Sequence, residues 1–258
     1  MNPTKTIQLV GGPTVLLEFG GLRLLTDPTL DLPRHYSQGG MESEKTIAPA
    51  LSAAELGHVD AVLLSHDEHF DNLDAAGRQL LQDVPLTLTT PGGAERLGGT
   101  ARGLRPFEST ELERPGGGTV TVTAVPARHG PAGVEAVLGQ VSGFWLAAEA
   151  LGAVYVTGDN ASLDHVREIG HRLGSPDLIV QFVGAVHNPE WFDGQLLTMD
   201  GLGAQVTATL LGARAIAIAH AEGWSHYSEG RDEAVDAFTA AGLADRLLNI
   251  PVGDVVAF

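Results

Sequence analysis

An apolar run beginning at Ala61 stops at Ser65, and the next six residues contain two histidines and three acidic side chains. The side chains that could bind a metal are His66, Glu68, His69 and Asp71. Imidazole nitrogens and carboxylate oxygens are donors that suit zinc, manganese or iron. The segment therefore predicts a metal site, with a polar loop carrying surface histidines as the alternative interpretation.

Other short apolar runs along the chain also end in a residue that can bind a metal or a proton. The end residues are Asp27, His129, Asp159 and His220. Ligand and catalytic groups collect at the carboxyl ends of strands, because the sheet holds the loops rigidly and leaves their tips open. We expect these ends to converge on one cleft. Asp27 is expected to be a hydrogen-bond acceptor behind the ligands or a turn residue, since Pro28 follows it.

Two kinds of element are expected to hold these residues. Short apolar runs and glycine turns alternate in the first 26 residues, which predicts consecutive antiparallel strands. Later segments have helical spacing, and the expected helices span residues 72–81, 160–173, 201–211 and 228–240. Short polar residues near their starts predict caps at Asn72 or Asp74, at Asn160 or Ser162, and at Ser228.

The composition indicates a soluble protein with one domain spanning residues 1–258. A chain of 258 residues with 43% hydrophobic content can bury a large core. Its sequence shows neither a signal-peptide pattern nor an apolar stretch long enough to span a membrane. Because it has no cysteine, disulfides and thiolate ligands are excluded, and a cytoplasmic location is expected.

The net charge of the chain indicates which classes of partner it can bind. Acidic residues outnumber basic ones by 32 to 15, so the formal net charge is −17. Such a field repels polyanions, because nucleic-acid affinity depends on Lys and Arg neutralising phosphates. We therefore expect a small-molecule substrate, no nucleic acid and no membrane partner, and we leave open whether the chain forms a homo-oligomer.

The motifs, in their order along nearly the whole chain, resemble those of the metallo-β-lactamase superfamily. The similar positions are Asp27, the segment 66–72, His129, Asp159 and His220. Residues 220–227 and the segment Leu64-Ser65-His66-Asp67 are most similar to the branch that contains L-ascorbate-6-phosphate lactonase. The resemblance implies an α+β fold, a four-layer αββα sandwich of two back-to-back sheets with helices outside and metals at one sheet edge.

The first cluster departs from the family pattern, which is usually His-x-His-x-Asp-His. It is one residue longer, and Asn72 stands where the last histidine belongs. In one alignment His69 and Asp71 keep their roles and His66 reaches the metal through a bulge. In the other, His66 is the anchor and Glu68 takes the place of the second histidine.

We favour a first metal held by three histidines and a second site that shares one carboxylate with it. The ligands are His66, His69 and His129 for the first metal, Asp159 as the bridge, and Asp71 with His220 for the second. Asn72 is a weak neutral donor, so the second site is expected to be looser or empty, with Glu68 as a compensating oxygen ligand. Nitrogen and oxygen donors allow several divalent ions, and we expect one or two Zn²⁺ or Mn²⁺ ions.

The expected reaction is hydrolysis by a metal-activated water of an ester, lactone, amide or small phosphoester. Asp71 or Asp159 is expected to orient the water and accept its proton. His226 is expected to bond substrate or stabilise the oxyanion, and His187 and Trp191 to contact substrate from a loop over the site. For these last three residues a purely structural role is the alternative.

Two other functions stay open. The first is a phosphodiesterase or nuclease of the same superfamily, which the charge of −17 disfavours for a long polyanion. The second is a non-catalytic metal-binding protein with a degraded second site, which Asn72 motivates.

Overall fold

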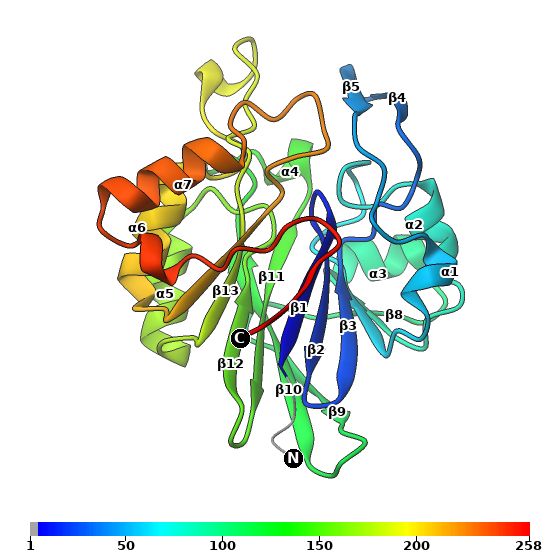
Figure 1. Cartoon of the computed structure of the whole chain (residues 1–258). Coiled ribbons are helices and arrows are strands. Elements are labelled where there is room, and N and C mark those ends of the chain that lie inside the picture. Colours follow the sequence, from blue (N-terminus) through cyan, green and yellow to red (C-terminus); the bar gives the residue numbers. More distant parts are fainter. Residues whose placement is uncertain (1–4) are drawn as a thin grey trace.

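Two β-sheets packed face to face form the centre of the computed structural model, which describes residues 5–258 (Figure 1). The first sheet has the order β15-β1-β2-β3-β6-β7-β8. Its strands are β1 (Thr6–Gly11), β2 (Thr14–Phe19), β3 (Leu22–Thr26), β6 (Ala61–Leu63), β7 (Thr87–Thr89), β8 (Ala101–Gly103) and β15 (Val255–Ala257). The first three strands pair antiparallel in sequence order, as the glycine turns predicted.

The second sheet has the order β14-β13-β12-β11-β10-β9. Its strands are β9 (Ser109–Glu113), β10 (Thr119–Ala127), β11 (Val141–Ala148), β12 (Gly152–Val156), β13 (Leu178–Phe182) and β14 (Ala215–Ala219). The strands β12, β13 and β14 are parallel, and β10 runs in the same direction because both β10 and β12 pair antiparallel with β11. The carboxyl ends of these four strands therefore lie at one edge.

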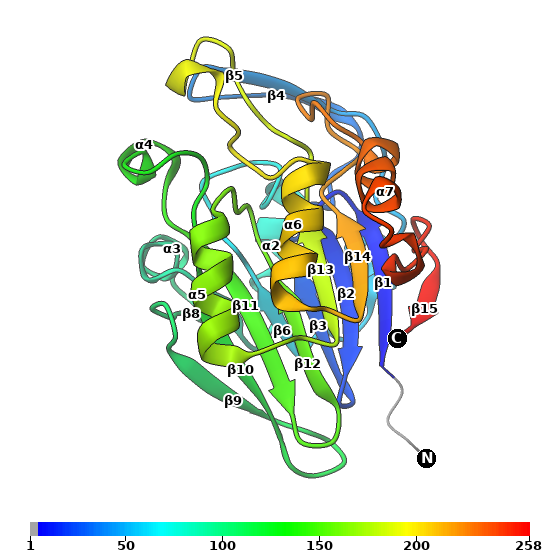
Figure 2. The ribbon, with the colours of Figure 1, turned by 90° about the vertical axis from the view of Figure 1, so that its left-hand side faces the viewer.

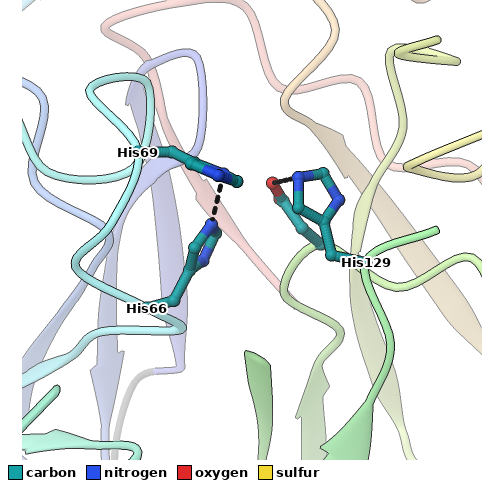
Figure 3. A group of neighbouring side chains, drawn as sticks. His66, His69 and His129 are labelled. Carbon is teal, nitrogen blue, oxygen red and sulfur yellow. Dashed lines mark hydrogen bonds and ion pairs between the residues drawn. The ribbon is translucent and has the colours of Figure 1, made fainter. Parts of the chain in front are cut away.

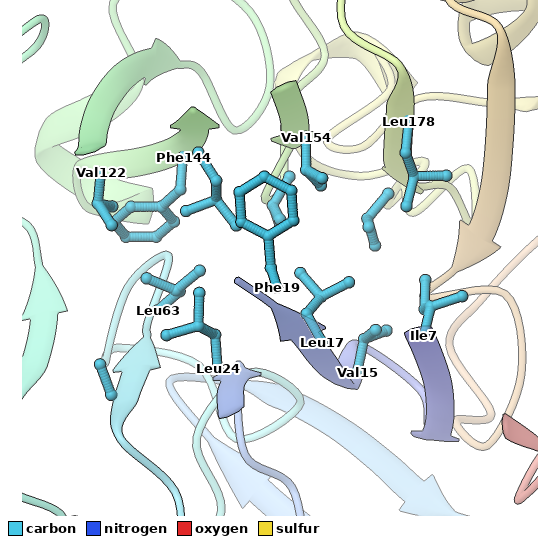
Figure 4. Close-up of a cluster of buried hydrophobic side chains, with 14 of the residues drawn as sticks. Ile7, Val15, Leu17, Phe19, Leu24, Leu63, Val122, Phe144, Val154 and Leu178 are labelled. Carbon is cyan, nitrogen blue, oxygen red and sulfur yellow. The ribbon is translucent and has the colours of Figure 1, made fainter. Parts of the chain in front are cut away.

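Alternating side chains fill the space between the sheets (Figure 4). In β2, Val15, Leu17 and Phe19 point into this core, whereas Leu16 packs on the opposite face among residues of α1 and α2. Successive side chains of a strand point to opposite faces, so a strand covered on both sides reads as a continuous apolar run. Burial of both faces explains the continuous apolar run of residues 15–17 in β2.

Helices cover the outer face of each sheet (Figures 1 and 2). The helices α1 (Ala53–Leu56), α2 (Ala75–Leu80) and α3 (Pro91–Leu97) lie outside the first sheet, and α5 (Leu163–Leu173), α6 (Gly201–Leu211) and α7 (Arg231–Ala240) lie outside the second. The short helix α4 (Glu135–Leu138), the 3₁₀ turns Phe192–Gly194 and Ala244–Arg246, and the hairpin of β4 (Arg34–Gln38) and β5 (Met41–Lys45) complete the structure. The four-layer αββα sandwich expected from the sequence is confirmed.

The helix starts agree with the predicted caps at two positions and differ at a third. Asp74 caps α2 and Ser162 caps α5, each accepting a backbone N–H from the first turn. The prediction that Ser228 caps the last helix was wrong, because α7 begins at Arg231 with Gly230 as its cap. The backbone N–H of Ser228 donates instead to the carbonyl of Gly184, at 2.8 Å. Within residues 5–258 no helix combines the length and the apolar composition needed to cross a lipid bilayer.

Candidate metal centre

The strand ends singled out in the sequence meet at one edge of the sandwich. Asp27 directly follows β3, His66 follows β6, His129 follows β10, Asp159 follows β12 and His220 follows β14. Two of them adopt positive φ angles, 29° at Asp27 and 56° at His220. Such conformations cost roughly 1–3 kcal/mol in non-glycine residues and persist where the surrounding structure imposes them. The chain therefore turns sharply at these two ends of the site.

Two groups of side chains there have the geometry of metal-ligand sets. Among residues 5–258, the first group comprises His66, His69, His129 and Asp159, and the second comprises Asp71, Asp159 and His220. Within each group one ligand atom from every residue lies within 4.8 Å of the others. Figure 3 shows the three histidines of the first group, with His66 and His69 coming from one loop and His129 from the other sheet. Asp159 belongs to both groups.

The histidine orientations suit metal ligation. Nδ1 of His129 donates to the carbonyl of Leu197, and Nδ1 of His220 donates to that of Val183, each at 2.8 Å. These bonds leave Nε2 of each ring directed at the cluster, as in metal sites whose ligands are oriented by outer hydrogen bonds. In the part of the chain that the structure describes, the buried Nε2 of His220 has no hydrogen-bond partner. A divalent cation would satisfy this atom, so the residues fit a metal.

Two carboxylates lie close to that atom. Nε2 of His220 is 3.3 Å from Asp71 Oδ2 and 3.5 Å from Asp159 Oδ1, close enough for ion pairing but without hydrogen-bond geometry. Burial opposes the charged imidazolium, but the two carboxylates outweigh it and raise the pKa of His220 to about 9. The pKa of Asp71 is lowered despite its burial, because His226 and His220 stabilise its charge.

In the first group, the pKa values of His66 and His69 are lowered, whereas that of His220 is raised. Burial, together with the neighbouring imidazoles, holds the pKa of His66 well below 6.5. Burial and His129 lower the pKa of His69 to about 4. Both rings are therefore neutral at pH 7, which is the state that binds a metal.

Asn72 and Asp27 lie behind the shared carboxylate. Asp27 accepts the backbone N–H of Ser65 at 2.6 Å, and burial raises the pKa of its carboxyl to about 8. The amide nitrogen of Asn72 lies 3.3 Å from both Asp27 Oδ2 and Asp159 Oδ1. Asn72 thus links the two acids by hydrogen bonds, and its Oδ1 is buried without a partner among residues 5–258. Asp27 takes the acceptor role expected of it.

Glu68, named in the sequence analysis as a ligand, points elsewhere. Its carboxylate pairs with the guanidinium of Arg96, and in residues 5–258 it belongs to neither ligand group. Arg96 also holds Asp67, through Nε at 3.0 Å from Asp67 Oδ2. The loop therefore turns His66 and His69 inward and the two intervening acids outward toward α3, which agrees with the alignment that gives His69 a ligand position.

The three candidate substrate residues occupy different positions. Nε2 of His226 donates to Asp71 Oδ2 at 3.0 Å, and its Nδ1 lies 2.6 Å from the Ser43 hydroxyl in β5. His187 is exposed, and its Nδ1 lies 3.0 Å from the carbonyl of Ala185. Trp191 lines a cavity next to the cluster. In this structure, then, His226 supports a ligand, and Trp191 lies where substrate could reach it.

That cavity has a volume of about 450 Å³ and contains His69 in its wall. Its apolar lining comes from the hairpin, the cluster loop, α4 and the loop after β13, through Met41, Phe70, Val137, Leu138 and Trp191. A mostly apolar wall with a few polar groups beside the chemistry is typical of small-molecule sites.

Sequence reasoning missed two residues that shape the site. Tyr227 stacks on His220 with ring centroids 4.3 Å apart, and burial raises its pKa. Its place beside His226 was the available signal. Ser43, which bonds His226, gives no local signal, because it lies in a hairpin 183 residues away in sequence.

Comparison with known proteins identifies the family. A model described as a beta-lactamase superfamily domain matches residues 22–248. Two uncharacterised proteins, from Mycobacterium tuberculosis and Mycobacterium bovis, are each 28% identical over 219 residues. The alignments cover 81% of this chain and 56% of each relative, so the chain spans little more than half the length of these curated relatives.

Solved structures share the fold over the whole length. An isothiocyanate hydrolase from Delia radicum gut bacteria has a TM-score of 0.81 and 23% identity, with coverage of 98% of this chain and 99% of the other. A possible metal-dependent hydrolase from Veillonella parvula has a TM-score of 0.82 and 17% identity, with 99% coverage of both. A metallo hydrolase from Ignicoccus hospitalis has a TM-score of 0.72 and 19% identity, with coverage of 99% of this chain and 98% of the other. The family model spans most of the sequence, and the chain therefore belongs to the beta-lactamase superfamily, with the metallo-β-lactamase fold.

Proposed function

We propose that the protein is a metal-dependent hydrolase of a small molecule: a carboxylic ester, a lactone, an amide or a small phosphoester. The observation that carries this proposal is the position of Asp159. Its carboxylate belongs both to a group of three histidines and to a group with Asp71 and His220. A carboxylate shared by two ligand sets places two candidate metal positions side by side, which suits a two-metal hydrolytic site.

When bound, a divalent ion at such a site supplies Lewis acidity and brings the pKa of a coordinated water toward neutrality. The chain's own residues orient the reaction. Asp71, held by Nε2–H of His226, is a carboxylate with a lowered pKa that can accept a hydrogen bond from water and orient it. Asp71 or Asp159 receives the proton of the attacking water, and Trp191 and its apolar neighbours exclude bulk water from the substrate.

The finer assignments are part of the same proposal. Zn²⁺ or Mn²⁺ fits the nitrogen and oxygen donors, and the second ion binds more weakly because Asn72 stands in place of a histidine. A lactone substrate follows from the resemblance to the L-ascorbate-6-phosphate lactonase branch. The nuclease alternative is not favoured, since a net charge of −17 opposes a long polyanion.

The test combines metal content with turnover. The purified protein is assayed with Mn²⁺ or Zn²⁺ against esters, lactones, amides and small phosphoesters, and its metal is measured by elemental analysis. Substituting His129→Ala or Asp159→Ala should remove metal and activity together. His58→Ala is the matched control, because His58 is an exposed histidine whose ring pairs with Asp60 and belongs to neither ligand group of residues 5–258. Full activity in either ligand variant would overturn the proposal.

Isothiocyanates belong in the substrate panel. One of the fold neighbours is an isothiocyanate hydrolase, and the cavity beside His69 has apolar walls that suit an alkyl or aryl substituent. Turnover of benzyl isothiocyanate that is lost in Asp159→Ala would extend the proposal to this electrophile. Turnover that persists in Asp159→Ala would separate that reaction from the metal centre.

A further inference from the structure

A second cavity is lined by residues of α2, α3, β7 and β8 and of the turns beside them. The helices α2 and α3 lie outside the first sheet (Figure 1). Its volume is about 410 Å³. Among residues 5–258, the charged side chains in its lining are two arginines, Arg78 and Arg96, without an acidic residue. In a chain with 32 acids and 15 bases, a cavity whose charged lining residues are both arginines departs from the average composition.

Both arginines have donors to spare. Arg78 is exposed and makes one side-chain hydrogen bond, from Nη2 to the carbonyl of Asp67, and among residues 5–258 it has no carboxylate partner. Arg96 uses Nε and Nη2 to bind Asp67 and Glu68. Its Nη1 takes no part in a hydrogen bond with the described residues. A guanidinium presents five N–H donors in a planar fork, so each arginine can hold a further oxyanion.

An independent observation comes from Thr87 in β7. Leu88 points into the core between the sheets, so Thr87 points the other way, into the layer of α2 and α3. Its side chain lines the cavity, yet the hydroxyl is buried and has no hydrogen-bond partner in the described part of the chain. Buried hydroxyls are normally paired, and one without a partner beside two arginines is a donor that lacks an acceptor.

We propose that this cavity binds a small tetrahedral oxyanion, either inorganic phosphate or the phosphate group of a small molecule. Arg78 and Arg96 supply the charge, and the Thr87 hydroxyl, which is buried in the structure, becomes the third donor when the ligand displaces the side chains that cover it. Guanidinium forks match phosphate oxygens in geometry and charge. Donors from three different elements suit the tetrahedrally arranged oxygens of phosphate better than the coplanar pair of a carboxylate. Both arginines also border the cavity beside His69 and contact Asp67 in the cluster loop, so this site adjoins the metal centre but shares no proposed metal ligand with it.

Isothermal titration with inorganic phosphate tests the proposal on the protein as purified, at an ionic strength held constant with NaCl. Removing a charge-assisted donor in Arg78→Gln should weaken phosphate binding about tenfold or more. Thr87→Val should weaken it about threefold and raise the thermal midpoint of the phosphate-free protein, because valine has the same shape without the unpaired hydroxyl. Arg167→Gln removes the same charge on α5, outside the other sheet, and should leave the affinity unchanged.

The following results would contradict the proposed phosphate site. Equal phosphate affinity in Arg78→Gln and Arg167→Gln would overturn the site, as would absence of wild-type binding up to about 10 mM phosphate. Binding that survives Arg78→Gln and Thr87→Val but disappears in His129→Ala would place the anion at the metal centre instead. Acetate binding as tightly as phosphate would refute the tetrahedral geometry.

Discussion

Metal binding should expel a proton from His220. In the structure, this ring donates through Nδ1 to the carbonyl of Val183, and its Nε2 lies between Asp71 and Asp159. The two carboxylates outweigh burial and raise its pKa to about 9, so the ring is charged at pH 7. A histidine binds a metal through the lone pair of a deprotonated ring nitrogen. A metal that binds at Nε2 of His220 therefore displaces the proton from that nitrogen.

The magnitude follows from the pKa. A group with a pKa of about 9 is protonated in about 99% of molecules at pH 7, so His220 contributes about one proton per metal bound. The rise from 6.5 to about 9 corresponds to roughly 3 kcal/mol of stability at about 1.4 kcal/mol per pH unit. Because the folded-state pKa is raised, this stability is complete below about pH 6.5 and is lost as the pH rises through 9.

Two measurements check the reasoning. Calorimetric titration of metal into the metal-free protein, in buffers with different ionisation enthalpies, should give a proton release that falls by about one between pH 7 and pH 10. Urea unfolding of the metal-free protein should show that His220→Gln removes roughly 3 kcal/mol of the stability difference between pH 6 and pH 9.5. Glutamine keeps a polar side chain at this position but cannot carry the charge.

Either of two results would refute this argument. The first is a proton release that does not change between pH 7 and pH 10. The second is an equal dependence of stability on pH in the wild type and His220→Gln. Asp27 also titrates in this range, since its pKa is raised to about 8, and for that reason the variant is compared with the wild type rather than the wild type judged alone.

Three further predictions concern the supports of the site. Lys45→Met should cost roughly 3–5 kcal/mol in urea unfolding, because it strands the buried carboxylate of Asp74 that Lys45 contacts at 3.0 Å, and adding Asp74→Asn should recover part of the loss. Asn72→His should increase the affinity of the second site for its metal, as measured by competition with a chelator. An unchanged affinity would contradict the proposal that Asn72 stands in place of a histidine ligand. His226→Ala should lower kcat about 10–100-fold with little loss of bound metal, because it frees Asp71; unchanged kcat at full metal content would contradict that role.

The sequence by itself determined the classes of element and most of the ligand types. Short apolar runs such as residues 15–19, separated by glycine turns, predict consecutive antiparallel strands, and the structure has them. Asp74 and Ser162 predict helix starts because a short side chain caps N–H groups only three residues away. Such features depend on neighbours in sequence, so they can be read from it.

The direction of each cluster side chain was decided by the tertiary structure alone. The sequence offered His66 and His69 as the favoured ligands and Glu68 as a compensating one, but Arg96 on α3 pairs with Glu68 away from the cluster, while His129 from the other sheet faces the two histidines. The contact between Ser43 and His226 likewise depends on how the hairpin lies over the cluster. Residue types state which bonds a side chain can make. Which bonds form depends on partners that strand pairing brings from distant positions, and a single sequence does not encode those pairings locally.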